Sequence, residues 1–203
     1  MDKYDEHTLL AIKNKLGGSV KLRSGVNAFR YRLHNYKGME ELVSRINGNI
    51  RNSKRVPQLM RVCRILNIPF ITPIPLSISN GWYSGFFDAD GSIVAKFDSP
   101  SPTITISASN KSKIDLEPFL VFNGNIYYDK SGYGSHIWQI SSKSDVLNLL
   151  SYFKSYPSRS HKLARLSLVS QFYTLKSLKA HGLPISTPLY NSWGSLKSKW
   201  EYR

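Results

Sequence analysis

The sequence predicts an α+β fold in which antiparallel hairpins and helices form two related units in tandem. Residues 103–109 alternate strictly between polar and apolar side chains, which is typical of a strand with one buried face. Short turns that contain glycine separate pairs of such strands, and segments with helical periodicity follow each pair. Matching positions of the two copies lie about 106–108 residues apart. This repeat indicates one complete unit and one shortened unit.

The complete unit is expected over residues 79–180. Its helical segments are a first helix that ends at Gly91, then Lys113–Phe122, Asp145–Tyr156 and His161–Leu178. Its strands are Ser92–Phe97, Thr103–Ser109, Ile126–Tyr128 and Ser135–Ser141, and the last two form a hairpin. Residues 181–203 are expected to be a C-terminal extension.

The shortened unit covers residues 1–68 and repeats only the second part of that pattern. Its elements are the helix Glu6–Leu16, the hairpin strands Val20–Arg23 and Ala28–His34, and the helices Met39–Ile46 and Val56–Leu66. The first helix and first strand pair have no counterpart before Tyr4. Residues 69–78, whose first seven include three prolines, are expected to form a linker between the units.

Net charge is the outlier of the composition. The 203 residues contain 28 Lys and Arg against 13 Asp and Glu, for a net charge of +15, which favours a polyanionic partner over an ordinary basic surface. The 41% hydrophobic content argues against disorder, and a single cysteine, Cys63, excludes an internal disulfide and a cysteine zinc site. No apolar run has membrane length, so no membrane partner is expected.

Residues 82–93, Trp-Tyr-Ser-Gly-Phe-Phe-Asp-Ala-Asp-Gly-Ser-Ile, are the most informative segment. Small residues on one stripe of a helix allow a second backbone to approach closely, so the segment is expected to pack against a partner helix. Two carboxylates, Asp88 and Asp90, stand at the unfavourable negative end of the helix dipole, which suggests that a hard divalent cation offsets their charge. The alternative is an ordinary polar turn, since Asp and Gly are common turn residues.

The nine residues from Tyr83 to Gly91 resemble the motif of LAGLIDADG homing endonucleases and intron maturases. Five positions match by identity and two by class, whereas Tyr83 and Ser84 are looser matches. The order of helices and strands is similar to the αββαββα unit of this family, in which saddle-shaped antiparallel sheets straddle the DNA major groove and paired motif helices form the central interface. The chain resembles the C-terminal portion of a member with two units.

The resemblance implies a site at the end of the motif helix. Asp90 and the Gly91 carbonyl would bind Mg²⁺ for phosphodiester hydrolysis, Asp88 would support the helix junction, and Lys162 and Lys54 would be the basic residues near the metals. The implied interface residues of the motif helix are Tyr83, Ser84, Gly85, Phe86, Phe87 and Asp88. Because the family uses two acidic motifs and this sequence has one, a partner is expected to cover the motif helix, and without it Phe86, Phe87 and the small residues would be exposed.

Two sheet faces are candidate nucleic-acid surfaces. In the first hairpin, alternation places five basic side chains on one face, which favours nucleic-acid contact over a merely solvated face: Lys21, Arg23, Arg30, Arg32 and His34. The complete unit has a more weakly indicated polar face with Lys96, Thr103, Thr105, Ser107, His136 and Gln139.

Two functions therefore remain open. The first is a site-specific DNA endonuclease, or a fragment of one, that needs a partner to supply the second motif. The alternative is a non-catalytic RNA-binding protein, an intron maturase or a protein of structured RNA such as ribosomal RNA; the start of the sequence after the position of a first motif favours this alternative. Family resemblance implies a mitochondrial, organelle-encoded protein, with the chloroplast as the alternative, and the N-terminus has neither signal-peptide nor transit-peptide character.

Overall fold

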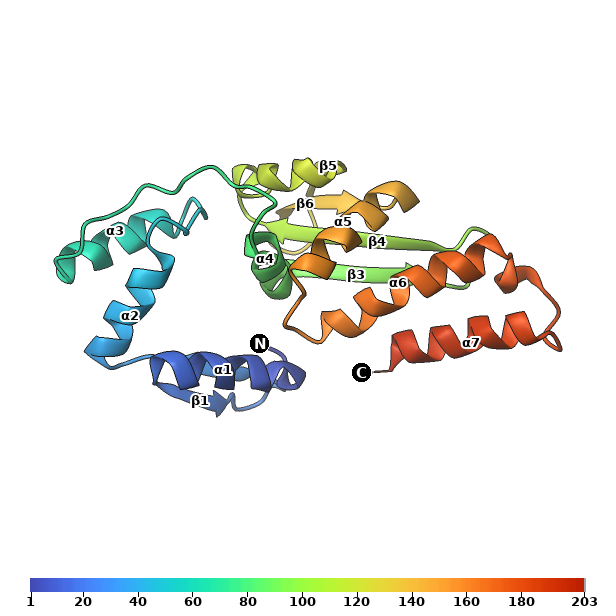
Figure 1. Ribbon diagram of the computed structural model, residues 1–203, viewed down its shortest axis with the longest axis horizontal. Coiled ribbons are helices and arrows are strands. Elements are labelled where there is room, and N and C mark those ends of the chain that lie inside the picture. The colour runs from blue at the N-terminus through green and yellow to red at the C-terminus, as the bar shows by residue number, and fades with distance from the viewer. Residues whose placement is uncertain (203) are drawn as a thin grey trace. The chain divides into compact units, whose positions relative to one another are not determined.

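The computed structural model describes residues 1–202, and these form two separately packed units. The chain divides into Met1–Ser77 and Ile78–Arg203. In Figure 1 the N-terminal unit runs from blue to teal, and the C-terminal unit from green to red. Each unit has its own helices, its own antiparallel strands and its own apolar core.

The N-terminal unit is a hairpin with three α-helices. Its elements are the short 3₁₀ helix Lys3–Asp5, α1 (Glu6–Leu16), β1 (Ser19–Leu22), β2 (Phe29–Arg32), α2 (Tyr36–Ile46) and α3 (Val56–Ile65). α2 begins after Asn35, whose side-chain oxygen accepts a hydrogen bond from the Gly38 N–H at 2.6 Å. Val43 of α2 packs with Leu59 and Cys63 of α3, so these two helices share a small core.

The C-terminal unit is a four-stranded sheet with helices. Its strands are β3 (Gly91–Lys96), β4 (Thr103–Asn110), β5 (Asn125–Asp129) and β6 (Ser135–Ile140), in the order β3-β4-β6-β5 with every neighbouring pair antiparallel. The α-helices are α4 (Trp82–Asp90), α5 (Lys143–Ser155), α6 (Lys162–Ser177) and α7 (Pro188–Glu201). Three short 3₁₀ helices complete the unit: η2 (Lys113–Asp115), η3 (Glu117–Phe122) and η4 (Ala180–Gly182).

One face of this sheet forms the core. Ile93, Ile106 and Trp138 are each at most 2% exposed, and strand alternation places them on the same face. α4, α5 and α6 contact β3 or β4 and lie across the sheet (Figure 1). The opposite face carries Ser, Thr and other partly exposed side chains. The sheet therefore offers one open surface to a partner.

Residues 113–122 do not form the expected α-helix. The segment consists of the two 3₁₀ helices η2 and η3. Pro118 lacks the N–H that an α-helix would use at that position, and its ring would meet the carbonyl four residues earlier. The prediction of a continuous helix was therefore wrong.

The C-terminal extension contains a helix that the sequence analysis did not anticipate. α7 begins after Thr187, whose side-chain oxygen accepts from the Tyr190 N–H, with Pro188 in the first turn. Trp193 and Trp200 are buried, and their rings lie 5.2 Å and 5.9 Å from the ring of Phe97. α7 is thus part of the apolar packing of the C-terminal unit. Among the described residues, the helices are too short or too polar to cross a bilayer.

Candidate active site and nucleic-acid interface

The motif helix α4 buries one side in its own unit. Tyr83 and Phe87 are 2% and 1% exposed, and Ser84 is buried between them. The Tyr83 hydroxyl donates to the Pro118 carbonyl at 3.1 Å, and the Ser84 N–H donates to the Tyr152 hydroxyl at 3.2 Å. These contacts hold the helix against η3 and α5.

The expectation that Phe87 would be exposed without a partner helix was wrong. Phe87 points into the unit, where its ring lies 5.0 Å from that of Phe153, whereas Phe86 is half-buried against Phe119. The exposed stripe is narrower and consists of Gly85 and Ala89. A methyl group added at Gly85 would meet nothing within 4 Å, so this side of the helix is open to a close neighbour.

Asp88 joins the end of α4 to the segment between α5 and α6. Its carboxylate accepts hydrogen bonds from the Ser158 hydroxyl, from the Ser160 hydroxyl at 2.8 Å and from the Arg159 N–H at 2.8 Å. Both serines are buried, at 1% and 4% exposure. A carboxylate is required here because several donors converge on two oxygen atoms. Asp88 is therefore a structural residue of the site.

Lys162, the first residue of α6, crosses to the C-terminal end of α4. Its ammonium donates to the carbonyls of Phe87 and Asp88, both at 2.8 Å, and lies 5.5 Å from the centre of the Phe87 ring. A cation is favourable at this position because helix carbonyls carry partial negative charge. The geometry places Lys162 at the C-terminal end of the motif helix, near Asp90, and its role beside a metal ion stays a prediction.

Asp90 ends α4 and is exposed. Desolvation by the surrounding protein raises the pKa of its carboxyl, and the nearby positive charge of Lys162 lowers it by a smaller amount. Gly91, at the start of β3, packs so closely on Phe87 that an added methyl group would overlap the Phe87 ring. Glycine is therefore needed at this turn, and the Asp90 carboxylate stands next to it at the edge of the sheet.

The residues around Asp90 provide part of a metal site. No cluster of three or more His, Cys, Asp or Glu side chains occurs within the described part of the chain. Mg²⁺ commonly uses one or two carboxylates together with water and substrate phosphates. A single carboxylate and a neighbouring carbonyl fit such a shared site, but they do not form a closed protein cage.

Lys54 belongs to the N-terminal unit and lies in the turn before α3. It is exposed, and its backbone N–H donates to the Asn52 side-chain oxygen at 3.1 Å. Its position before α3 corresponds along the chain to that of Lys162 at the start of α6. Its proposed role beside a metal ion rests on this position along the chain.

Basic side chains share one face of the β1–β2 hairpin. Lys21 lies opposite Arg30, and Arg32 lies opposite Ser19. Together with Arg23 they line an open groove of about 300 Å³. Within residues 1–202, no ion pair or side-chain hydrogen bond engages any of these four basic residues. The hairpin thus presents uncompensated positive charge on a surface.

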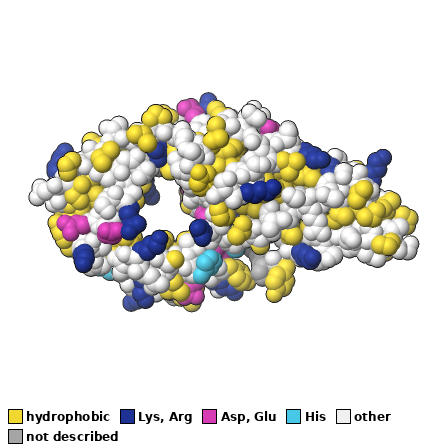
Figure 2. Space-filling model, viewed as in Figure 1, with side chains coloured by type: hydrophobic (Ala, Val, Ile, Leu, Met, Phe, Trp, Pro, Cys, Tyr) yellow, Lys and Arg dark blue, Asp and Glu magenta, His cyan; other side chains and the backbone are white. Residues whose placement is uncertain are grey.

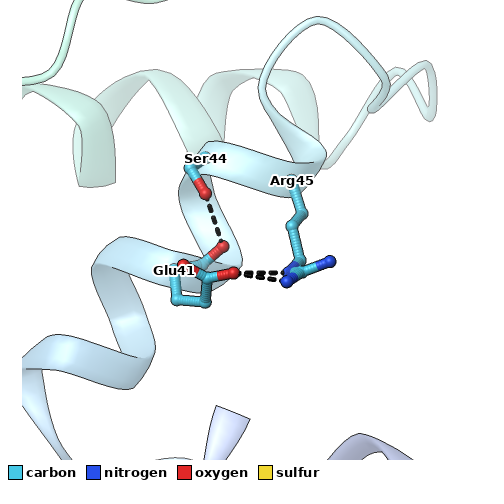
Figure 3. A network of polar contacts seen from close by, with 3 residues as sticks. All are labelled: Glu41, Ser44 and Arg45. Atoms are coloured by element: carbon cyan, nitrogen blue, oxygen red, sulfur yellow. Dashed lines mark hydrogen bonds and ion pairs between the residues drawn. The ribbon is translucent and has the colours of Figure 1, made fainter. Parts of the chain in front are cut away.

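His34, the fifth basic residue expected on this hairpin, follows β2 and is exposed in the short segment before α2. By contrast, Arg45 of α2 is compensated, because its guanidinium lies 2.5 Å from the Glu41 carboxylate (Figure 3). Lys and Arg side chains are clearly more numerous than Asp and Glu on the face drawn in Figure 2. The hairpin is therefore one part of a generally basic surface.

The open face of the larger sheet carries most of the expected polar residues. The register places Lys96 opposite Thr103 and Ser107 opposite both Ser92 and Gln139. Thr105 lies two residues from Ser107 on the same face. Each of these residues is partly or fully exposed.

The expectation for His136 was wrong. His136 shares the core-side face of β6 with Trp138, two residues away. Its ring lies 5.0 Å from that of Tyr128, which is opposite it on the edge strand β5. Its Nδ1 atom is 3.3 Å from the Lys111 carbonyl oxygen. His136 and Gln139 were expected on the same face of the strand, but residues three positions apart in a strand point to opposite faces.

A family model agrees with this geometry. The model for LAGLIDADG endonucleases matches residues 83–173, from the motif helix into α6. The intron-encoded DNA endonuclease ai2b of Dictyostelium discoideum is 33% identical to this chain over 209 residues, which cover 98% of the chain and 78% of the relative. The chain belongs to the LAGLIDADG endonuclease family.

Two longer relatives of this family carry different functional names. The probable intron-encoded endonuclease aI2 of Debaryomyces hansenii is 45% identical over 97% of this chain, and the intron-encoded RNA maturase bI4 of Saccharomyces cerevisiae is 48% identical over 97%. The chain spans only 32% and 31% of their respective lengths. Both the endonuclease and the maturase functions therefore occur among close LAGLIDADG relatives.

The fold is also that of LAGLIDADG meganucleases. The crystal structure of the meganuclease I-AabMI bound to uncleaved DNA matches with a TM-score of 0.71 at 20% identity, and the match covers 99% of this chain and 86% of that one. The α+β fold with antiparallel sheets is thus confirmed over essentially the whole chain. Endonucleases of this family use divalent metal ions.

Three residues that share a face of the larger sheet with Gln139 were not predicted from the sequence. Asn125, Tyr127 and Ile137 lie on the open face of β5 and β6, next to Gln139. The segments that contain them are short, and their alternation fits either face until the position of Trp138 is known. The burial expected of a tryptophan was the one signal in the sequence that indicated which face of β6 is buried.

Proposed function

We propose that this chain provides the DNA-binding sheets and one catalytic carboxylate of an intron-encoded, site-specific DNA endonuclease. The reaction is hydrolysis of phosphodiester bonds in duplex DNA. The observation that carries the proposal is the placement of Asp90. Asp90 is the last residue of the motif helix and lies beside the sheet. The hydrogen bonds of the Asp88 carboxylate and of the Lys162 ammonium hold this end of the helix in place.

Mg²⁺ is the proposed metal ion. Asp90 and the Gly91 carbonyl would hold it, together with water and a phosphate oxygen of the substrate. When bound, the ion supplies Lewis-acid polarisation of the phosphate and a more acidic water molecule. The chain itself keeps Asp90 at an exposed position and holds the helix end firmly, so that the carboxylate does not have to reorganise when the substrate binds.

The proposal requires a second motif helix. Residues 1–203 contain one Asp-Ala-Asp-Gly sequence, so a second carboxylate has to come from outside these residues. The open side of α4, formed by Gly85 and Ala89, is the surface on which a counterpart helix would pack. Longer sequence of the same protein or a separate polypeptide can supply this helix.

The second candidate function is that of an RNA maturase. It is favoured by the 48% identity to the RNA maturase bI4 and by the basic hairpin, since phosphates of either nucleic acid attract such a surface. The larger sheet favours DNA. Its open face is suited to the wide major groove of B-DNA, whereas the major groove of A-form RNA is too narrow for side chains to read.

Cleavage and binding assays distinguish the two functions. The protein, alone and with a copurifying or coexpressed counterpart, would be incubated with Mg²⁺ and a duplex library spanning intron insertion sites. Cleavage that is lost in Asp90→Asn supports the endonuclease. Tight binding of folded intron RNA over a range of KCl concentrations, together with no cleavage of any duplex, would contradict it and support the maturase.

The proposed location is the mitochondrion. The relatives are intron-encoded proteins, and two of them come from yeasts. An organelle-encoded protein acts where it is made and binds introns or insertion sites of the same genome. Immunodetection in purified mitochondria would test this location, and detection only in another compartment would exclude it.

A further inference from the structure

The Arg165 guanidinium on α6 joins two other elements of the C-terminal unit. Its Nε atom donates to the Trp200 carbonyl of α7 at 3.2 Å, and its Nη1 atom donates to the Ile93 carbonyl of β3 at 3.4 Å. The guanidinium carbon also lies 5.9 Å from the centre of the buried Trp200 ring. A guanidinium is a rigid planar fork, so carbonyls that bond to different nitrogens are held at a set separation. Arg165 therefore links the last turn of α7 to β3.

The end of α7 is a favourable place for this cation. Carbonyls in the last turn of a helix lack partners within the helix and carry partial negative charge. α7 packs along α6 (Figure 1), and Lys197 of α7 forms an ion pair at 2.7 Å with Asp98, which follows β3. α7 is thus connected to the strand near both of its ends, through Arg165 and through Lys197.

Lys162 and Arg165 contact the chain on either side of the Asp90–Gly91 junction. They lie three residues apart at the start of α6, so their side chains leave the helix on the same side. Lys162 bonds two carbonyls at the end of α4, and Arg165 bonds the Ile93 carbonyl in β3. The junction, which provides the proposed ligands of Mg²⁺, lies between these points of the chain. Loss of either contact would release one side of the junction from α6.

We propose that Arg165 is a positioning residue for phosphodiester hydrolysis, because it fixes the Asp90–Gly91 junction relative to α6 from the β3 side. This role rests on the proposed endonuclease function and extends it to α7, whose last turn orients the guanidinium. Arg165 acts through the backbone of β3 and need not touch the metal ion or the phosphate. A displaced carboxylate lowers the rate even where the substrate still binds, since reacting groups have to lie close to their productive positions.

The test measures single-turnover cleavage of the target duplex with Mg²⁺ by the full chain and the counterpart that supports cleavage. Arg165→Met is expected to lower the rate constant at saturating protein by about tenfold. The dissociation constant for the duplex is expected to change by less than about twofold, since the substitution lies outside the proposed DNA-binding faces. Arg165→Lys keeps the charge but has a single nitrogen, so its rate constant should stay several-fold below that of the wild type.

Lys197→Met is the matched control. It also removes one positive charge and one contact of α7, the ion pair with Asp98 near the other end of β3. Its cleavage rate constant is expected to stay within about twofold of the wild type, because this exposed ion pair contributes little to stability and lies away from the junction. Melting temperatures identify any loss of folding, and all assays run well below the lowest of them.

Backbone NMR of the free chain adds a measurement that needs no substrate. The amide order parameters of Asp90 and Gly91 are expected to be near the rigid value of about 0.85 in the wild type. They should fall in Arg165→Met and stay unchanged in Lys197→Met. Unchanged order parameters in Arg165→Met would contradict the restraint itself.

The cleavage results separate failure of the positioning role from failure of the proposed function. If the wild type cleaves and Arg165→Met or Arg165→Lys cleaves at the same rate, the guanidinium has no positioning role, and the endonuclease function stands. An equal loss in Lys197→Met would likewise assign the effect to general loosening of α7. If the wild type cleaves no duplex with any counterpart, the proposed function fails and the catalytic role of Arg165 fails with it.

Discussion

The Lys162 ammonium donates a hydrogen bond to the Asp88 carbonyl at 2.8 Å, so the first residue of α6 caps the last turn of the motif helix. The same ammonium also bonds the Phe87 carbonyl. One side chain thus satisfies two carbonyl groups at the end of α4. This structural role exists whether or not Lys162 also acts on a phosphate.

Replacing Lys162 by Met is expected to lower the free energy of unfolding by about 1–2 kcal/mol, because two hydrogen bonds and a favourable helix-end charge are lost. The pKa of Asp90 is expected to rise further, since Lys162 is the charge that now lowers it. Urea unfolding and carboxyl NMR titration measure the two effects. Lys162→Arg is the control that keeps the charge. An unchanged unfolding free energy together with lost cleavage would show that Lys162 acts only on the substrate.

Asp90→Asn is expected to stabilise the protein near neutral pH. The carboxylate is partly desolvated and lies at the negative end of a helix, so the amide should raise the free energy of unfolding by about 0.3–1 kcal/mol. The folded-state pKa of Asp90 is raised above its ordinary value, so the folded protein binds this proton more tightly than the unfolded chain does. The wild type therefore recovers this stability as the pH falls through the raised pKa.

The difference in melting temperature between wild type and Asp90→Asn should consequently be largest near pH 7 and disappear in acid. Calorimetry at several pH values checks this dependence. Asp145→Asn serves as a control that is expected to lower the free energy of unfolding near neutral pH, where Asp90→Asn raises it. The reason is that hydrogen bonds from Ser142 and Asn123 lower the pKa of Asp145. A stabilising effect of Asp90→Asn that is equal at all pH values would contradict the electrostatic explanation.

Asp88→Ala is expected to be strongly destabilising, by about 2–4 kcal/mol, because two buried serine hydroxyls and the Arg159 N–H lose their acceptor. Asp88→Asn should cost less, since a serine hydroxyl is able to rotate and accept from the new amide. Chemical denaturation measures both variants. If Asp88→Ala unfolds like the wild type but binds no metal, Asp88 is a metal ligand and the structural assignment is wrong.

Local pattern accounts for the strands and for most helices of this chain. The alternation in residues 103–109 predicted a half-buried strand, which in the structure is β4 (Thr103–Asn110). Glu6–Leu16 ends as expected at Gly17, which has a positive φ of 77°. The error at residues 113–122 was also local, since Pro118 was present in the sequence. A correct reading of that proline would have given two short helical turns.

Other features depend on contacts between distant segments and had no local signal. Asp88 is 71 residues from Arg159, and Phe97 packs on Trp193 and Trp200 of α7. The role of Asp88 at a helix junction came from the family resemblance, because nothing in its neighbourhood along the sequence identifies its partners. The orientation of Phe87 followed from the way α4 lies on the sheet, which the helical spacing alone does not determine.

Tyr173→Phe is expected to be neutral or stabilising. The Tyr173 hydroxyl is buried and has no hydrogen-bond partner among the described residues, and desolvation raises its pKa to about 12. Removing an unsatisfied buried hydroxyl should increase the free energy of unfolding by up to about 1 kcal/mol. Tyr152→Phe is the matched control. It should destabilise, because the Tyr152 hydroxyl bonds the Asn80 carbonyl at 2.7 Å and the Ser84 N–H.

The basic hairpin is expected to set the salt dependence of nucleic-acid binding. Each phosphate contact contributes about 0.9 to the slope of log K against log salt concentration on B-DNA, because it releases a counterion. Replacing Lys21 and Arg30 by Ala should therefore reduce the magnitude of this slope by about two and weaken binding to specific and random duplexes alike. Fluorescence anisotropy over a range of KCl concentrations measures the slope.

The control for this experiment removes the same net charge from helix surfaces of the other unit. Lys154→Ala combined with Lys199→Ala lowers the net charge by two, as the hairpin variant does, at exposed positions on α5 and α7. If only net charge mattered, both double variants would reduce the slope equally. A reduction confined to the hairpin variant identifies the opposed pair Lys21 and Arg30 as phosphate contacts, because counterion release depends on cations that lie against the nucleic acid.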